Sequence, residues 1–259
     1  MSSPTVLHVQ GVSKRFGGLQ ALSDVGIKIE QGQVYGLIGP NGAGKTTFFN
    51  VLTGLYLPDS GTFELGGKPY EPSAVYEVAK AGIARTFQNI RLFAEMTALE
   101  NVMVGRHVRT RSGLLGAVFR TGGFKSEEAA IARRAQELLD YVGIGGYADF
   151  KARTLSYGDQ RRLEIARALA TDPKLVALDE PAAGMNATEK VVLRELIDQI
   201  RNDGSTILLI EHDVKLVMGL CDRVTVLDYG KQIAEGTPYE VQRNQKVIEA
   251  YLGASHVAH

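Results

Sequence analysis

The sequence has a single cysteine, no tryptophan and no excess of charge of either sign among its 259 residues. Because Cys221 has no second cysteine to pair with, an internal disulfide is excluded, which is typical of a reducing compartment. Lysine plus arginine and aspartate plus glutamate each number 29, so we expect no broad basic surface for nucleic acid or anionic lipid. Nucleic acid is therefore not a predicted partner.

Long apolar runs are also missing. The longest, such as residues 207–210 and 224–227, have the length of strands and fall short of the roughly 18 residues of a membrane-spanning helix. At the N-terminus no charged segment precedes an apolar stretch, so no secretory signal is predicted. Hydrophobic residues make up 44% of the chain, as in soluble globular proteins. Any role at a membrane is expected to need a partner that crosses it.

The spacing of apolar residues changes along the chain. Short apolar or alternating runs in the first third and from residue 175 onward predict strands, and the later ones alternate with helical segments. Between about residues 89 and 165 helical spacing prevails, interrupted by an Arg- and Gly-rich stretch at 106–124 that we interpret as an insertion or loop. Apolar strands that alternate with helices favour a mainly parallel sheet covered on both faces.

We therefore predict an α/β fold in a single domain over residues 1–259. Residues 1–88 and 166–259 are expected to form the core with its mainly parallel sheet and an N-terminal antiparallel β subdomain. A hairpin in this subdomain has Gly66 and Gly67 at its tip. Residues 89–165 are expected to form an inserted α-helical subdomain.

A glycine-rich motif follows the apolar run at residues 34–38. Residues 39–46 read GPNGAGKT and match the pattern G-x-x-x-x-G-K-[ST] in full. Its glycines let backbone N–H groups converge on a phosphate, and the helix expected after it points its N-terminus at the same charge. The alternative, a chance match, is disfavoured because the motif stands between a predicted buried strand and a predicted helix. The core is therefore predicted to be a P-loop NTPase (RecA-like) core.

This motif predicts binding of ATP with Mg²⁺. Lys45 is expected to reach the β and γ phosphates, and the Thr46 hydroxyl is expected to ligate Mg²⁺. The predicted ATP-binding residues of the loop are Gly39, Pro40, Asn41, Gly42, Ala43, Gly44, Lys45, Thr46 and Thr47.

Two carboxylates follow the apolar run at residues 175–178. At such a strand end, Asp179 is expected to hold Mg²⁺, and Glu180 can orient and deprotonate the attacking water. An apolar run that ends in two acids is by itself often only a strand that meets solvent. The phosphate loop expected on the same sheet gives the pair its catalytic interpretation.

Four further segments complete a pattern with the phosphate loop. They are ARTFQNIRLF around Gln88, LSYGDQRRLEIARAL from Leu155, PAAGMN after the acidic pair, and TILLIEH up to His212. In order and spacing the set resembles the nucleotide-binding subunits of ABC transporters over nearly the whole chain. The resemblance is greatest to the ATPases of branched-chain amino acid importers.

The resemblance implies roles for three further residues. Phe16 would stack on adenine, Gln88 would sense Mg²⁺ and the attacking water, and His212 would contact the γ phosphate. The alternatives are that Phe16 is a core aromatic and that His212 is a structural histidine. The predicted catalytic residues are thus Glu180, His212, Gln88 and Lys45, and the predicted metal ligands are Thr46, Gln88 and Asp179.

The signature segment comprises Leu155, Ser156, Tyr157, Gly158, Asp159 and Gln160. The Ser156 hydroxyl and the N–H groups around Gly158, at the start of a predicted helix, would form a second anion site, although an ordinary helix N-terminus has the same features. The resemblance implies that this segment binds ATP held by the opposite subunit of a head-to-tail dimer. Tyr157 replaces the first glycine of the usual LSGGQ, and Asp159 replaces its glutamine. Asn186 replaces a usual aspartate, which favours a non-identical second ATPase.

The function implied by the resemblance is ATP hydrolysis that drives import of branched-chain amino acids, at the cytoplasmic face of the cell membrane. The implied partners are a second ABC ATPase, two integral membrane permease subunits and, indirectly, a periplasmic or extracellular amino acid-binding protein. Alternatives are a system for urea or amides, lipid export, a soluble ABC ATPase, or a nucleotide switch without hydrolysis. The single phosphate loop weighs against a soluble ABC ATPase, and Glu180 with His212 weighs against a switch.

Overall fold

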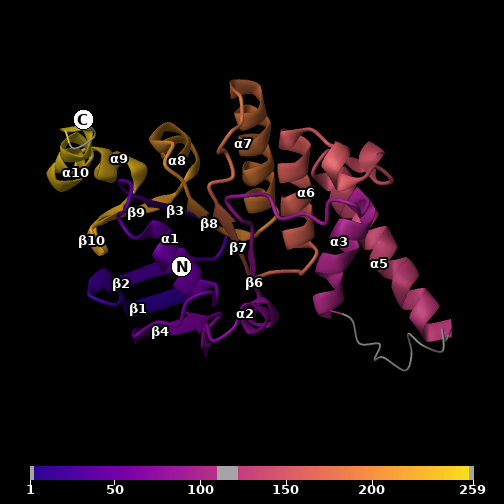
Figure 1. Ribbon diagram of the computed structural model, residues 1–259, viewed down its shortest axis with the longest axis horizontal. Helices are drawn as coiled ribbons and strands as arrows, with labels where there is room; N and C mark the ends of the chain where they lie inside the picture. The colour runs from indigo at the N-terminus through magenta and orange to yellow at the C-terminus, as the bar shows by residue number, and fades with distance from the viewer. Residues whose placement is uncertain (1–2, 110–121, 257–259) are drawn as a thin grey trace.

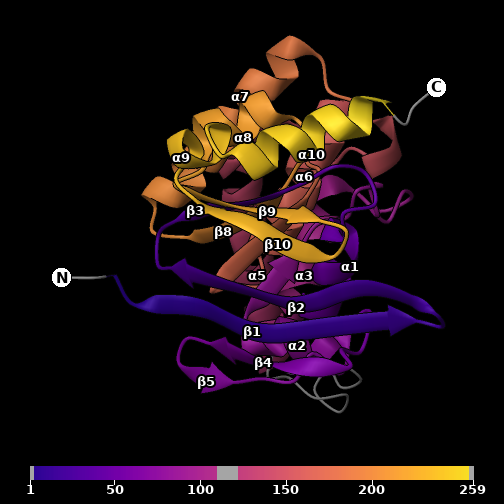
Figure 2. The same ribbon diagram turned by 90° about the vertical axis from the view of Figure 1, so that its left-hand side faces the viewer.

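The computed structural model describes residues 3–109 and 122–256 (Figure 1). An antiparallel sheet lies at the N-terminal end, with strand order β2-β1-β4-β5. Its strands are β1 (Thr5–Phe16), β2 (Leu19–Glu30), β4 (Ser60–Leu65) and β5 (Lys68–Pro69). The β4–β5 hairpin turns at Gly66 and Gly67, which both have positive φ, as predicted. Figure 2 shows this sheet stacked beneath the second one.

The second sheet has strand order β10-β9-β3-β8-β7-β6 and is parallel except for β10. Its strands are β3 (Val34–Ile38), β6 (Ile83–Arg85), β7 (Leu175–Asp179), β8 (Thr206–Ile210), β9 (Arg223–Asp228) and β10 (Lys231–Gly236). The predicted α/β fold with a mainly parallel sheet and an antiparallel β subdomain is confirmed. Because β3, β6, β7 and β8 are parallel, the segments after them meet at one edge of the sheet.

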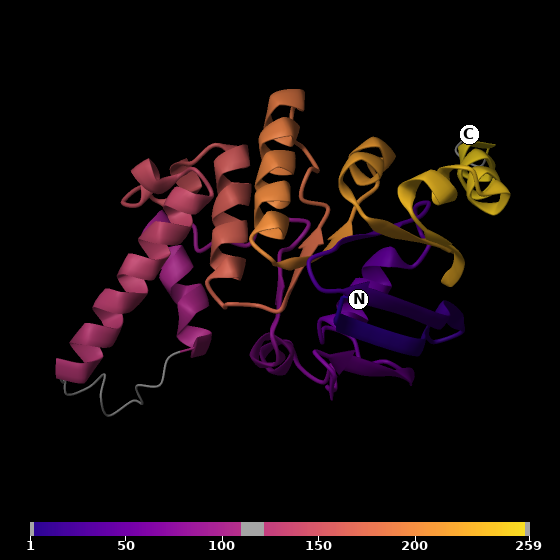
Figure 3. The same ribbon diagram turned by 180° about the vertical axis from the view of Figure 1, so that it is seen from behind.

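Helices cover both faces of the parallel sheet (Figures 1 and 3). The helices of the described residues are α1 (Lys45–Leu52), α2 (Val75–Ala81), α3 (Ala98–Arg106), α5 (Gly122–Tyr141), α6 (Tyr157–Leu169), α7 (Ala187–Asn202), α8 (Val214–Leu220), α9 (Pro238–Gln242) and α10 (Gln245–His256). Short 3-10 helices span His107–Arg109, Gly145–Tyr147 and Ala152–Thr154. Among the described residues, no helix combines the length and the apolar character needed to cross a membrane.

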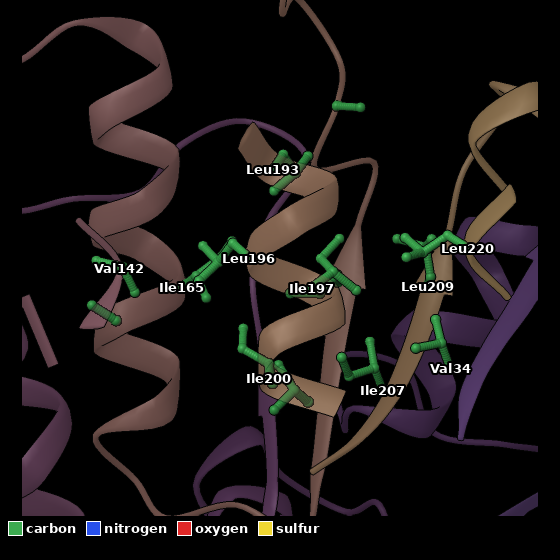
Figure 4. Close-up of a cluster of buried hydrophobic side chains, with 14 of the residues drawn as sticks. Val34, Val142, Ile165, Leu193, Leu196, Ile197, Ile200, Ile207, Leu209 and Leu220 are labelled. Carbon is green, nitrogen blue, oxygen red and sulfur yellow. The ribbon is translucent and has the colours of Figure 1, made fainter. Parts of the chain in front are cut away.

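Alternate residues of the buried strands enter two hydrophobic clusters. Val34 and Ile207 face a cluster that α3, α5, α6, α7 and α8 complete, part of which Figure 4 shows. Tyr35 and Leu208 face the other cluster, in which α1 packs between the parallel sheet and the antiparallel sheet. Both faces of the parallel sheet are therefore buried, which explains why its strands are continuous apolar runs. The phosphate-loop helix α1 is fixed between the two layers.

The helical region continues the first cluster. Helices α3 and α5 pack beside α6, and residues of all three join the cluster that covers the sheet. The subdomain boundaries at residues 89 and 166 stay predictions, and the second boundary falls within α6. Of the loop predicted at 106–124, residues 110–121 lie outside the described residues.

Candidate nucleotide-binding site

The loop at residues 39–46 leads from β3 into α1. Its first and last glycines lie close to backbone atoms of other strands. A Cβ on Gly39, which has φ 155°, would stand 2.2 Å from the Leu227 carbonyl oxygen. A Cβ on Gly44, with φ 102°, would stand 2.9 Å from the Ala21 carbonyl oxygen. Both positions therefore require glycine. Because Gly44 is the N-cap of α1, no side chain caps the first N–H groups of the helix, and they can bind an anion.

Lys45 places its ammonium group inside the loop. The side-chain Nζ donates to the carbonyl oxygens of Gly39, at 2.7 Å, and Pro40, at 3.0 Å. Burial lowers the pKa of Lys45, and the Glu180 carboxylate opposes this shift. The charge is thus held within the loop, where a phosphate bound by the loop would meet it.

A cavity of about 310 Å³ opens over the loop. Part of its lining comes from the loop and α1, and part from Phe16 and Tyr229. Phe16 is 43% exposed and meets Tyr56 edge-to-face, with ring centroids 5.2 Å apart, so its interpretation as a core aromatic is wrong. Tyr229 is a lining residue that sequence reasoning missed. Its φ of 43° and the neighbouring Gly230 turn its 85% exposed ring out beside the cavity.

Two predicted site residues from neighbouring segments contact the Glu180 carboxylate. Gln88, after β6, donates from Nε2 to the Glu180 carboxylate at 2.9 Å. The Nδ1 atom of His212 lies 3.4 Å from the same carboxylate. The run TILLIEH predicts a strand that ends at His212, but β8 ends at Ile210, and the two-residue extension carries the ring to Glu180. Glu180 itself has φ 45°, a strained conformation for a residue with a side chain.

Asp179 is buried at the end of β7, beside Glu180. Burial raises the pKa of its carboxyl group to about 6, an effect that Arg85 opposes from 3.4 Å. The Asp179 carboxylate, the Thr46 hydroxyl and the Gln88 amide are hard oxygen donors. Mg²⁺ in nucleotide sites takes one or two such groups together with phosphate oxygens. The predicted ligand set therefore fits Mg²⁺ in its chemistry.

Arg85 is a site residue that sequence reasoning missed. Its guanidinium lies over the rings of Phe49 and Phe87, 4.5 Å from each centroid, and donates to Asn50 of α1 at 3.1 Å. Arg85 therefore joins the phosphate-loop helix to Asp179. The sequence around Arg85 carries no signal that indicates this contact.

The signature segment lies apart from the phosphate-loop cavity. Ser156 is the N-cap of α6, with its Oγ accepting from Asp159 N at 3.2 Å and donating to the Asp159 carboxylate at 2.7 Å. Ser156, Gly158 and Asp159 line a separate cavity of about 100 Å³ with residues of α7. The apolar spacing of residues 160–170 predicts a helix from Gln160, but the helix begins at Tyr157 because Ser156 caps it there. Gln160 donates back to the Leu155 carbonyl oxygen at 2.9 Å.

Two family models match the chain. One described as ABC transporter matches residues 22–183, and one described as branched-chain amino acid ATP-binding cassette transporter matches residues 231–257. The chain is 47% identical over 254 residues to the high-affinity branched-chain amino acid transport ATP-binding protein LivG of Salmonella typhimurium. It is 46% identical to the corresponding protein BraF of Pseudomonas aeruginosa. Each match covers 98% of this chain and 99% of the relative.

Solved structures agree with this match. The ADP conformation of MJ1267, an ATP-binding cassette of an ABC transporter, has a TM-score of 0.83 and 33% identity, covering 96% of this chain and 99% of its own. The dimeric structure of the ATP-binding cassette MJ0796, bound to ADP and Pi, has a TM-score of 0.75 and 26% identity. The match covers 90% of this chain and 98% of the MJ0796 chain. The similarity therefore extends over the whole fold described above.

Proposed function

The chain belongs to the ABC transporter family as an ATPase of the branched-chain amino acid type, and on that premise we propose that its ATP hydrolysis drives import of leucine, isoleucine and valine. The observation that carries the chemistry is the meeting of Gln88 and His212 on Glu180, at the sheet edge that also bears the phosphate loop.

In the proposed mechanism Glu180 takes a proton from the attacking water. The amide of Gln88 donates to the Glu180 carboxylate at 2.9 Å and orients it, and His212 approaches the same carboxylate from the end of β8. Lys45 neutralises charge on the γ phosphate, and Phe16 provides an exposed ring for adenine. Bound Mg²⁺ would supply further charge neutralisation, held by Thr46, Asp179 and Gln88.

We assign the signature segment to ATP held by a second subunit. Its Ser156 and Gly158 line a cavity that the phosphate loop does not share, which supports a site completed between two chains. The partner is proposed to be a non-identical ATPase, since Asn186 replaces the usual aspartate. Asn186 still caps α7, accepting from Glu189 N at 3.0 Å, so the replacement preserves the helix start.

The remaining partners follow from the family. We propose that two integral membrane permease subunits bind the chain at the cytoplasmic face of the membrane, and that an amino acid-binding protein acts through them. None of the proposed site residues selects the cargo, so selectivity belongs to these partners.

Removal of Mg²⁺ tests the proposed hydrolysis. For the transporter assembled from this chain, its second ATPase and its permeases, we expect EDTA to reduce steady-state ATP hydrolysis to the background rate. Addition of Mg²⁺ in excess over EDTA should restore the rate, because the chain binds the metal with its nucleotide. Hydrolysis that continues at the full rate in EDTA would contradict the proposed site.

A further inference from the structure

Tyr157, the first residue of α6, contacts the segment that follows Glu180. Its hydroxyl donates to the Ala183 carbonyl oxygen at 2.9 Å, and its ring lies 3.4 Å from where a Cβ on Gly184 would stand. A glycine, the usual residue at this signature position, could not make either contact. The departure from LSGGQ therefore creates a physical link between the signature helix and residues 181–186.

Arg161, one helical turn further, contacts the segment around Gln88. It is 1% exposed, donates from Nη1 to the Phe87 carbonyl oxygen at 2.5 Å, and donates from Nη2 to the Gln88 carbonyl oxygen. The same Nη2 lies 3.2 Å from the Tyr157 hydroxyl oxygen, to which it donates. One face of α6 thus contacts both the segment that carries Gln88 and the segment that follows Glu180.

Glu164 stabilises the contact between Arg161 and the segment around Gln88. Its carboxylate is 1% exposed and pairs with Arg161 at 3.0 Å, and it accepts from Phe87 N at 3.2 Å. Burial raises the pKa of Glu164, and the Arg161 charge opposes this. Buried charges of this kind are stable only while their partners stay in place, so displacing the Gln88 segment from α6 is costly.

These contacts close a ring through the site. Gln88 donates to the Glu180 carboxylate at 2.9 Å, and Ala183 N donates to the Glu180 carbonyl oxygen at 3.1 Å. The ring therefore runs from Gln88 through Arg161, Tyr157, Ala183 and Glu180 back to Gln88. A shift of α6 relative to the sheet changes both attachments at once.

We propose that Tyr157 and Arg161 are positioning residues for ATP hydrolysis, which transmit the position of the signature helix to the Gln88–Glu180 pair. This inference rests on the proposed function, in which Glu180 is the base. It adds that binding of the signature segment to the partner's ATP shifts α6, and that this shift changes the position of Gln88 relative to Glu180 in the same chain. In this account neither Tyr157 nor Arg161 touches the ATP on this chain's own phosphate loop or the attacking water; both act on that site through Gln88 and Glu180.

Tyr157→Phe tests the link, because it removes one hydroxyl and keeps the ring. In the assembled transporter we expect kcat to fall about three- to tenfold, with KM for ATP within about twofold of wild type. The matched control is Tyr141→Phe, whose hydroxyl donates to Asp203 at 2.6 Å, between the end of α5 and the end of α7. This control should leave kcat unchanged.

A double-mutant cycle with Gln88→Ala separates positioning from a merely structural role. If Tyr157 acts through Gln88, Tyr157→Phe should lower kcat by less than about 1.5-fold in the Gln88→Ala background. The proposal is overturned if Tyr157→Phe lowers kcat by the same factor in both backgrounds, or if it has no effect in wild type.

Amide hydrogen exchange on the isolated full chain gives a readout that does not depend on hydrolysis. Tyr157→Phe is expected to speed exchange at residues 181–186 and also at residues 87–91, which Tyr157 reaches through Arg161. Faster exchange at residues 181–186 alone, or no change in exchange, would overturn the proposed link between Tyr157 and the Gln88 segment. Failure of the proposed function is a separate result, namely a wild-type transporter that does not hydrolyse ATP.

Discussion

Replacement of Glu180 by glutamine is expected to lower steady-state ATP hydrolysis by about two to four orders of magnitude while ATP binding is retained. Glutamine has nearly the same shape as glutamate and can still accept from Gln88, so the geometry of the site should persist. It cannot accept a proton from the attacking water at neutral pH. The measurements are steady-state hydrolysis by the assembled transporter and equilibrium binding of ATP to the variant.

The matched control for this prediction is Glu195→Gln, at an exposed position on α7. It makes the same chemical change away from the site and should leave hydrolysis at the wild-type rate. Turnover by Glu180→Gln within tenfold of wild type would show that another group takes the proton. Loss of ATP binding would show instead that Glu180 has a structural role.

Replacement of Lys45 by methionine is expected to weaken ATP binding at least about 100-fold. The change removes hydrogen bonds from a charged donor to phosphate, each worth about 1.5 kcal/mol or more, and two such bonds account for this factor. Methionine keeps the length of the apolar stem, so the buried space around Lys45 stays filled. Binding is best measured by titration calorimetry with ATP and Mg²⁺.

Two comparisons make the Lys45 result interpretable. Lys28→Met, at an exposed position on β2, makes the same substitution outside the site and should bind ATP like wild type. The melting temperature of Lys45→Met shows whether the loop survives without the bonds to the Gly39 and Pro40 carbonyl oxygens. A folded variant with wild-type ATP affinity would contradict the assignment of Lys45.

Features with a local cause could be predicted from the sequence. The strand β3 has the predicted bounds because a five-residue apolar run ends at a glycine that the phosphate loop requires. The pairing of strands from both ends of the chain followed from alternation with helices. The signature helix was expected three residues too late, because the hydrophobic pattern does not show that Ser156 caps it from outside.

Features that depend on distant partners could not be predicted. Arg85 lies against Asp179, 94 positions away, and the sequence of neither segment indicates the other. Glu211 is likewise buried, and accepts from Ala182 N at 2.9 Å and from His212 N at 3.2 Å, joining the segments after β7 and β8. Such contacts arise only once the parallel strands have set these segments side by side.

The contact made by Tyr157 also could not be predicted from the sequence. In the sequence it is only a departure from the usual signature, with no contact to explain it. In the structure its hydroxyl has a partner in Ala183. The departure is therefore explained by a contact within this chain, while the question of a non-identical partner stays a proposal supported by Asn186.

The central claim is that this chain drives uptake of branched-chain amino acids, and uptake into proteoliposomes tests it most directly. The vesicles contain the assembled transporter and enclose ATP with Mg²⁺, and labelled leucine is added outside with the amino acid-binding protein. We predict that leucine accumulates, that unlabelled isoleucine and valine compete, and that vesicles with Glu180→Gln accumulate none. ATP-dependent uptake of urea or an amide without uptake of leucine, or extraction of lipid instead, would contradict the claim.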